Sequence, residues 1–234
     1  EKANKDKYLP GVSLKQLYDL YCFDSLFKNY LFFIIEQIEV QLRSQISYEL
    51  AINYGSLGYK DPSYFQLKYN KKGQLIHTHI IDSLNDEIKR QQNIPFVKHH
   101  ITKYKGDFPI WVAVELLSFG NLSSLYSIML SQNRKNIANL YMVRDKYLDG
   151  WIQSLVEVRN ICAHYGRLYN LPLKHTPFLY KENRPYKGNK NKIFPVLLVI
   201  KRLLKANEQW GDFYKKIEET LDKHSQIVNL SFMG

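Results

Sequence analysis

The sequence has few of the features that stabilise secreted or membrane proteins. Its 234 residues include only two cysteines, Cys22 and Cys162, and they form no C-x-x-C pair or Cys/His cluster. This pattern indicates neither a disulfide framework nor a zinc site, and it predicts free thiols in a reducing compartment. The apolar runs at 30–35 and 193–200 are far shorter than the roughly 18 residues that a membrane span requires. We therefore expect no segment that crosses a bilayer.

Turn-forming residues are also scarce. Glycine and proline number 11 and 8, which is few for an all-β protein with many tight turns. Hydrophobic residues make up 45% of the chain and aromatic residues 14%, enough to form a folded core. The composition favours an all-α protein, and we expect residues 1–234 to form a single helical domain.

Acidic residues are outnumbered by basic ones. The chain has 33 Lys and Arg against 22 Asp and Glu, which gives a formal net charge of +11. Such an excess is typical of proteins that bind nucleic acid or an anionic membrane surface, although a solvated basic surface is the simpler alternative. The N-terminal EKANKDK is charged and lacks the apolar region of a signal peptide. We expect a cytoplasmic protein.

Apolar residues recur at helical spacing over most of the chain. The pattern predicts a short helix beginning at Leu14 after Ser13 and a longer helix from about 24 to 54 that ends at Gly55. It also predicts helices over about 61–69, 74–92, 109–119, 122–130, 134–141 and 145–165, and closing helices over 195–224. Residues 166–194 contain several prolines and glycines without a sustained period, so they are predicted to form a long loop.

The segment 151–170, WIQSLVEVRNICAHYGRLYN, carries the clearest chemistry. Trp151, Leu155, Val158 and Cys162 lie within about 60° of one another on a helix and form a buried stripe. Measured from Trp151, Asn160 lies at about 180° and His164 at about 220°, opposite the stripe, whereas Arg159 lies at its border at about 80°. Gly166 follows as the expected C-cap.

Arg159, Asn160 and His164 are residue types suited to phosphodiester chemistry. Histidine exchanges protons near neutral pH, arginine binds phosphate through a planar charged fork, and asparagine orients or donates. No His/Asp/Glu cluster nearby suggests a metal, so we expect chemistry without metal or cofactor. The alternative is structural, because Arg and His near a helix C-terminus also interact favourably with its carbonyls and dipole.

The sequence RNICAH resembles the signature of the HEPN superfamily, a set of helical domains that includes many RNA-cleaving toxins. The blocks YLPGVSLKQLYDLYCFD, EQIEVQLRSQISYEL (36–50), FPIWVAVELLSFGNLSSLY (108–126) and VRNICAHYGRLYN (158–170) together resemble the Abi-like family of bacterial abortive-infection proteins, of the AbiD and AbiF type. Family members usually carry a further N-terminal stretch with a YRLSGY-like motif, and this chain begins after that point.

The resemblance implies an antiphage protein of the bacterial cytoplasm with a HEPN-like helical bundle. In active members of the superfamily, the motif Arg and His of two subunits form a composite ribonuclease site at a homodimer interface. By this resemblance Arg159 and His164 are the catalytic pair and Asn160 is the polar helper. AbiF-type members are linked with noncoding RNAs, so the second hypothesis is a non-catalytic module that holds a structured noncoding RNA. A purely structural helical dimer is the third.

Basic and aromatic residues are interleaved in the loop 166–194, which has seven basic residues and one acid. Cations beside flat rings suit single-stranded RNA, although a solvated loop with locally packed tyrosines is the alternative. The expected RNA-binding residues are Tyr165, Arg167, Tyr169, Lys174, Arg184, Lys187, Lys190 and Lys192.

Three other groups attract notice. Lys98, His99, His100, Lys103 and Lys105 form a second basic cluster, which an ordinary helix surface also explains. Trp111, Leu116 and Phe119 are expected in the core. Glu36 and Glu39 resemble a carboxylate pair for acid–base work, but we expect a helix-surface or interhelix ion pair, because Arg43 lies one turn from Glu39.

Overall fold

The protein is all-α. The computed structural model describes residues 11–180, 188–204 and 208–234, and in these residues it contains nine α-helices and no strand. The helices are α1 (Leu14–Tyr54), α2 (Ile76–Arg90), α3 (Pro95–Lys103), α4 (Ile110–Leu116), α5 (Phe119–Ile128), α6 (Ser131–Leu140), α7 (Asp145–Ala163), α8 (Phe194–Leu203) and α9 (Glu208–Lys223). Short 3₁₀ turns occupy Gly58–Lys60, Pro62–Tyr64 and Leu230–Phe232.

Helix α1 is continuous over 41 residues, where the sequence predicted two helices. Ser13 caps it through a capping box, in which its hydroxyl accepts from the Gln16 N–H and the Gln16 side chain accepts from the Ser13 N–H. No glycine or proline interrupts the helix, and Phe23 and Phe27 extend its buried stripe toward the N-terminus. Gly55 ends the helix with φ 77°, as predicted.

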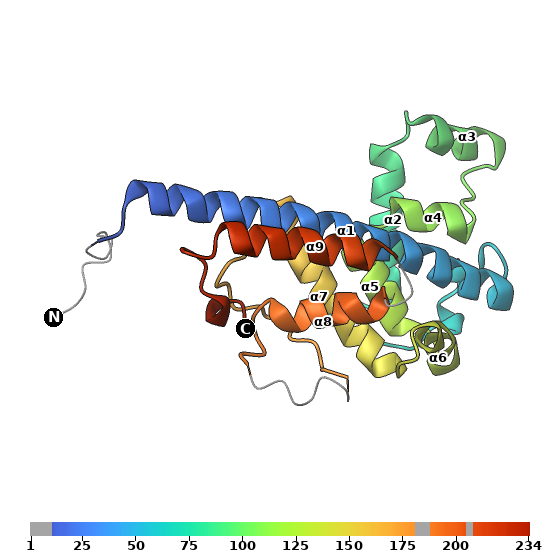
Figure 1. The fold of residues 1–234 in the computed structure, drawn as a ribbon. Helices are drawn as coiled ribbons and strands as arrows, with labels where there is room; N and C mark the ends of the chain where they lie inside the picture. Colours follow the sequence, from blue (N-terminus) through green and yellow to red (C-terminus); the bar gives the residue numbers. More distant parts are fainter. Residues whose placement is uncertain (1–10, 181–187, 205–207) are drawn as a thin grey trace.

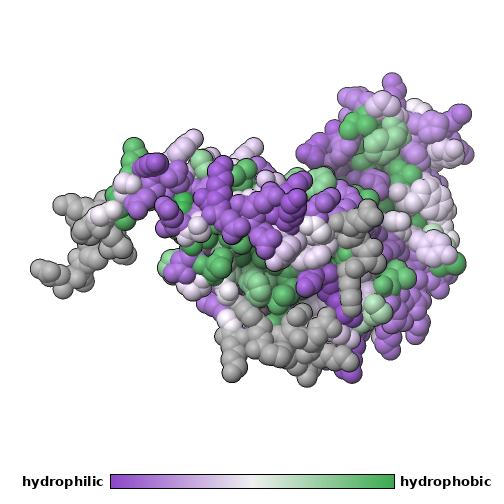
Figure 2. Space-filling model, in the orientation of Figure 1, coloured by the Kyte–Doolittle hydropathy of each residue, from purple (hydrophilic) through white to green (hydrophobic). Residues whose placement is uncertain are grey.

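The remaining helices are arranged around α1 (Figure 1). Helices α4, α7 and α9 pack directly against it. Helices α2, α3 and α4 form a lobe near the C-terminal end of α1, while α7, α8 and α9 lie along the rest of the helix (Figure 1). Figure 2 shows hydrophilic side chains over the outer face of α9 and hydrophobic side chains gathered between α9 and α8.

Two other local predictions were wrong. Residues 61–69 form a short 3₁₀ turn followed by an extended segment, because the segment pairs with α5 instead: Gln66 donates its N–H to the Ile128 carbonyl at 2.7 Å. Gly120 and Asn121 were predicted to end a helix but lie inside the first turn of α5. Ser118 caps this helix by accepting from the Asn121 N–H, so the break falls before Phe119.

The basic loop, residues 166–194, contains no helix before Phe194 in the part that the structure describes. Helix α8 begins one residue before the predicted start, and α9 ends one residue before the predicted end. In the described ranges, no helix is both long enough and apolar enough to span a membrane.

Candidate functional site

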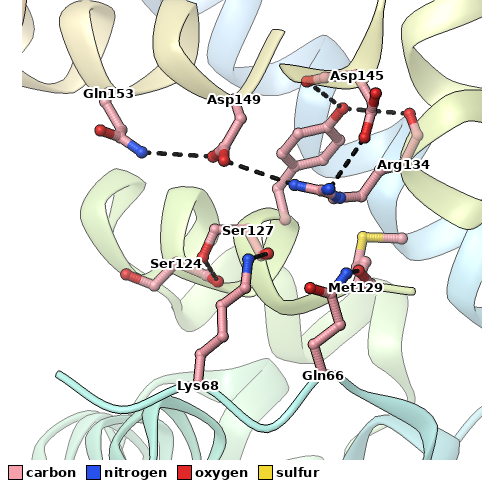
Figure 3. A network of polar contacts seen from close by, with 10 residues as sticks. Gln66, Lys68, Ser124, Ser127, Met129, Arg134, Asp145, Asp149 and Gln153 are labelled. Atoms are coloured by element: carbon pink, nitrogen blue, oxygen red, sulfur yellow. Dashed lines mark hydrogen bonds and ion pairs between the residues drawn. The ribbon is translucent and has the colours of Figure 1, made fainter. Parts of the chain in front are cut away.

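The start of α7 is fixed by Arg134 of α6, which lies between two carboxylates (Figure 3). Its guanidinium is 2.9 Å from Asp145 and 3.5 Å from Asp149. Burial raises the pKa of Asp149 above its usual value, and the opposing effect of Arg134 is the smaller one. Gln153 donates to Asp149 at 3.4 Å. This network holds the first two turns of α7 against α6.

The middle of α7 packs as its sequence pattern predicts. Trp151, Leu155 and Val158 are at most 1% exposed. Cys162 is half-buried at the end of the stripe, and burial raises its pKa to about 12. Asn160 and His164 are exposed on the other side of the helix. The core therefore fixes the rotation of α7 and presents its last turn in the orientation expected from the sequence.

Arg159 contacts α1. Its Nε is 3.5 Å from a carboxylate oxygen of Glu39, and its guanidinium lies 5.6 Å from the centre of the Phe32 ring. Glu39 is buried and also binds Arg43, as predicted, while Arg43 donates to the Val114 carbonyl. In the described residues no other acceptor binds Arg159, whose side chain is 32% exposed. The Glu39 contact positions one edge of the guanidinium and leaves its terminal nitrogens for an anion.

The end of α7 differs in detail from the prediction. His164, not Gly166, is the C-cap, and its N–H donates to the Asn160 carbonyl at 3.0 Å. Tyr165 takes the left-handed conformation, with φ 56°. Gly166 donates to the Ile161 carbonyl at 3.0 Å, and a Cβ at this glycine would lie 3.2 Å from the Ile161 side chain. Glycine is favoured here by close packing and not by its own φ.

Two charged residues of α1 fasten the turn that follows α7. The Lys28 ammonium group donates to the Gly166 carbonyl at 2.9 Å and pairs with Asp24 at 3.0 Å. Asp24 accepts from the backbone N–H groups of Leu168 and Tyr169 at 3.0 and 2.7 Å. Asp24 and Lys28 are both buried. The chain leaving the motif is therefore held against α1 by charge-assisted hydrogen bonds.

Glu157 of α7 holds the basic loop beside the motif. Its carboxylate accepts from the N–H groups of Lys174 and His175 at 2.8 and 2.7 Å and lies 2.9 Å from the His175 ring. Burial raises the pKa of Glu157, but these hydrogen bonds outweigh it, so the pKa lies below its usual value. The indole of Trp151 donates to the Phe178 carbonyl at 2.8 Å and anchors the loop further along.

The expected RNA-binding residues fall into three groups. Four are exposed near the end of α7 or on the loop: Tyr165, Arg167, Lys174 and Lys190. Arg184 and Lys187 lie outside the described residues. Tyr165 is 91% exposed directly after His164, although its left-handed conformation is one that glycine adopts more readily.

Tyr169 and Lys192 are buried, which corrects the expectation for both side chains. Tyr169 packs edge-on against Phe23 and its hydroxyl bonds the backbone of Asn229, so its ring has no free face for a base. Lys192 donates to the backbone and side-chain oxygens of Asn170 at 2.6 and 2.7 Å. The alternation of basic and aromatic residues in the sequence does not reveal which of these side chains are buried and bonded within the fold.

Sequence reasoning missed Asp24, Lys28 and the contact from Glu39 to Arg159. A signal was present for the first two, since Asp24 and Lys28 are a charged i, i+4 pair among apolar residues of one helix stripe. Charges at such positions are buried only when paired. Their partners in 166–169 are distant in sequence, so the sequence alone could not identify them.

Within the described residues, no hydrogen bond or ion pair joins the side chains of Arg159, Asn160 and His164 to one another. Arg159 lies against α1, whereas His164 is exposed at the end of the helix. In the same residues, no group of three His, Cys, Asp or Glu side chains could hold a metal ion. The arrangement offers a positioned cation and an accessible imidazole on different sides of one helix end.

Comparison with curated proteins and with solved structures finds no match. A family of sequences described as Abi-like protein matches residues 1–170. The match extends from the N-terminal residues through α7 and the turn that Asp24 and Lys28 fasten, and it covers most of the chain. The chain therefore belongs to the Abi-like family, which supports a general role in abortive infection.

Proposed function

We propose that the protein is a metal-independent endoribonuclease whose site forms when the α7 ends of two copies meet. The observation that carries this proposal is the separation of Arg159 and His164 around one helix end, each with an open edge. A symmetric partner places its own His164 beside the Arg159 that a single chain leaves incomplete.

In the proposed reaction, His164 accepts the proton of the RNA 2′-hydroxyl as its oxygen attacks the adjacent phosphorus. Arg159 stabilises the negative charge that develops on the phosphoryl oxygens, and Asn160 orients the phosphate or the imidazole. The bond between phosphorus and the 5′-oxygen breaks, and that oxygen takes a proton from water. The products are a 2′,3′-cyclic phosphate and a 5′-hydroxyl end. Glu39 contributes by fixing the Nε edge of Arg159.

The second candidate is a non-catalytic module that holds a structured noncoding RNA. The contact between Arg159 and buried Glu39 favours it, since an ion pair reduces the charge available to a transition state. In this case the exposed cations at the α7 end and on the basic loop bind phosphates, and His164 is a contact residue.

The first test is to purify the protein without nuclease treatment, sequence the RNA that accompanies it and map the ends. Heterogeneous fragments with cyclic phosphate ends support the nuclease, whereas one discrete intact RNA supports the binding module. Steep dependence of affinity on salt is expected for both and does not separate them.

The second test measures cleavage by Arg159→Ala and His164→Ala proteins. Each substitution should reduce the rate about 100-fold or more, while His79→Ala, at an exposed histidine of α2, should not. Mixing the two inactive proteins should restore cleavage, because one site of each mixed dimer then has an intact Arg159 and an intact His164. Unchanged cleavage by both single variants would refute the mechanism, and failure of the mixture alone would refute the composite site.

A further inference from the structure

A second concentration of positive charge lies outside the motif and the basic loop. Residues 89–106 contain five Lys or Arg residues, His99 and His100, and no acidic residue. This segment spans the end of α2, all of α3 and the start of the linker to α4. It belongs to the lobe near the C-terminal end of α1 (Figure 1). The proposed nuclease site leaves this charge unexplained.

The lobe contains a cavity with a volume of about 610 Å³. Its wall combines residues from the turn after α1, from α3, from the linker and from α4. The principal lining residues are Ser56, His99, Lys103, Tyr104, Lys105 and Trp111. We call it the α3–α4 cavity. Its volume is within the range of small-molecule binding sites.

Flat rings form much of this wall. His100 stacks on Phe108 with ring centres 5.2 Å apart. The ring centre of Tyr104 lies 5.3 Å from that of His100, with the rings tilted, and 5.5 Å from that of His99, edge-on. Tyr104 and Trp111 are each 53% exposed. Trp111 was predicted to be buried with Leu116 and Phe119, which are indeed in the core. A half-exposed indole beside an ordered group of rings is a surface on which a further ring can stack.

The cations of the cavity are not used by the fold. Across the described ranges, no acidic side chain forms an ion pair with Lys103 or Lys105. The one acidic lining residue, Asp107, is already paired with Lys60 at 2.7 Å. Lys105 adopts a left-handed conformation with φ 54°, followed by Gly106 with φ 83°. This tight turn brings the Lys105 side chain to the cavity wall.

We propose that the α3–α4 cavity binds a nucleobase together with its phosphate. The base stacks on Trp111 and Tyr104, and Lys103 and Lys105 bind the phosphate. The exposed rings favour a nucleotide over an acidic peptide, whose carboxylates would use only the lysines. The nucleotide belongs either to an unpaired RNA strand or to a free mononucleotide. The proposal does not depend on cleavage at α7.

The test is a binding titration of the intact protein with four probes: AMP, adenosine, inorganic phosphate and a fluorescent hexa-adenylate. The variants are Trp111→Ser, Trp111→Phe and the double substitution Lys103→Gln with Lys105→Gln. The matched charge control is Lys71→Gln with Lys72→Gln, two exposed lysines in the turn before α2. An acidic peptide, hexaglutamate, completes the set.

Trp111→Ser should weaken binding of AMP and hexa-adenylate by about tenfold or more, and Trp111→Phe by much less, because stacking needs only a flat ring. The Lys103/Lys105 double variant should lower the slope of log affinity against log salt by about 1.4 for the hexamer. The Lys71/Lys72 control should not. Equal affinities for AMP and the hexamer identify a mononucleotide site, whereas a clear preference for the hexamer identifies a strand.

Three results would overturn the proposal: no binding of AMP or hexa-adenylate to the wild-type protein, affinities unchanged in both cavity variants, or hexaglutamate binding as tightly as the hexamer. The result is also separable from the proposed nuclease. If the protein binds AMP in the cavity but cleaves no RNA, only the proposed nuclease is refuted. If the protein cleaves RNA but the cavity variants bind AMP and hexa-adenylate as tightly as the wild-type protein, only the proposed cavity site is refuted.

Discussion

Near the end of α7, three cationic side chains are bound to carboxylates or carbonyl oxygens of the fold, whereas the two lysines of the α3–α4 cavity form no ion pair in the described residues. Arg159 contacts Glu39, Lys28 contacts Asp24 and Gly166, and Lys192 contacts Asn170. Lys103 and Lys105 form no ion pair with any described acidic residue. A basic sequence segment can therefore supply either stability or binding capacity, and only the contacts of its side chains distinguish the two.

The largest expected effect comes from removing the acid shared by two arginines. Glu39→Ala leaves Arg43 buried without its carboxylate and should lower the free energy of unfolding by about 3 kcal/mol. Urea denaturation measures it. Glu36→Ala, three residues earlier on the exposed side of α1, should cost less than about 0.5 kcal/mol. Equal losses in the two variants would contradict a structural role for the Glu39 pairs.

Lys28→Met tests the fastening of the turn after α7. The apolar stem is retained, but the bonds to Asp24 and the Gly166 carbonyl are lost, which should cost about 2 kcal/mol. Limited proteolysis should cut near residue 166 faster than in the wild-type protein. The cavity substitution Lys103→Met is the control and should change neither quantity. If Lys103→Met destabilises the protein as much as Lys28→Met, the contrast between the two regions fails.

Glu157→Gln tests how the basic loop is held, and its effect should depend on pH. The pKa of Glu157 lies below its usual value of 4.5, so the ionised carboxylate stabilises the folded state. Its contribution is complete above about pH 5 and is lost as the pH falls through the lowered pKa. At pH 7 the variant should be less stable by about 1 kcal/mol, and the difference should shrink below pH 4.5.

The comparison of unfolding curves across pH uses Glu115→Gln, an exposed glutamate of α4, as the control. Its difference from the wild-type protein should remain small throughout. A Glu157→Gln difference that stays constant down to pH 3 would show that the carboxylate charge does not hold the loop.

The smallest expected effect has the opposite sign. Tyr165→Gly places glycine at φ 56° and loses no packing, because the tyrosine ring is 91% exposed. The protein should gain about 0.5 kcal/mol in stability, since the left-handed cost exceeds the added entropy of the unfolded chain. RNA affinity should fall if the ring contacts RNA. Tyr165→Phe should change neither the stability nor the RNA affinity. A loss of stability in Tyr165→Gly would reveal a packing role for the tyrosine ring.

The sequence predicted what depends on local spacing. The stripe of Trp151, Leu155 and Val158 and the end of α1 at Gly55 follow from helical periodicity and cap chemistry, which involve residues only a few positions apart. Trp111 was misplaced because α4 has seven mostly apolar residues, so its pattern does not say which side faces the core.

The sequence predicted which residues form the candidate site, but not the contacts and burial of their side chains. The faces of Asn160 and His164 follow from the helical wheel of α7. The contact of Arg159 with Glu39, and the burial of Tyr169 and Lys192, depend on segments brought together by the whole fold. Composition indicated a polyanionic partner, yet it could not show that Lys192 of the basic loop binds Asn170 within the fold.

Helix α1 fixes the spacing between the two cationic regions. Lys28 holds the turn after α7, and α1 ends at Tyr54, two residues before Ser56 of the α3–α4 cavity. The rise of the helix from Lys28 to Tyr54 is about 40 Å. An RNA strand that contacts both ends of this span must reach along α1, whereas a shorter RNA reaches only one end. Under the two proposals, the length of α1 sets which RNAs gain avidity, because only an RNA long enough to contact both regions binds to two sites at once.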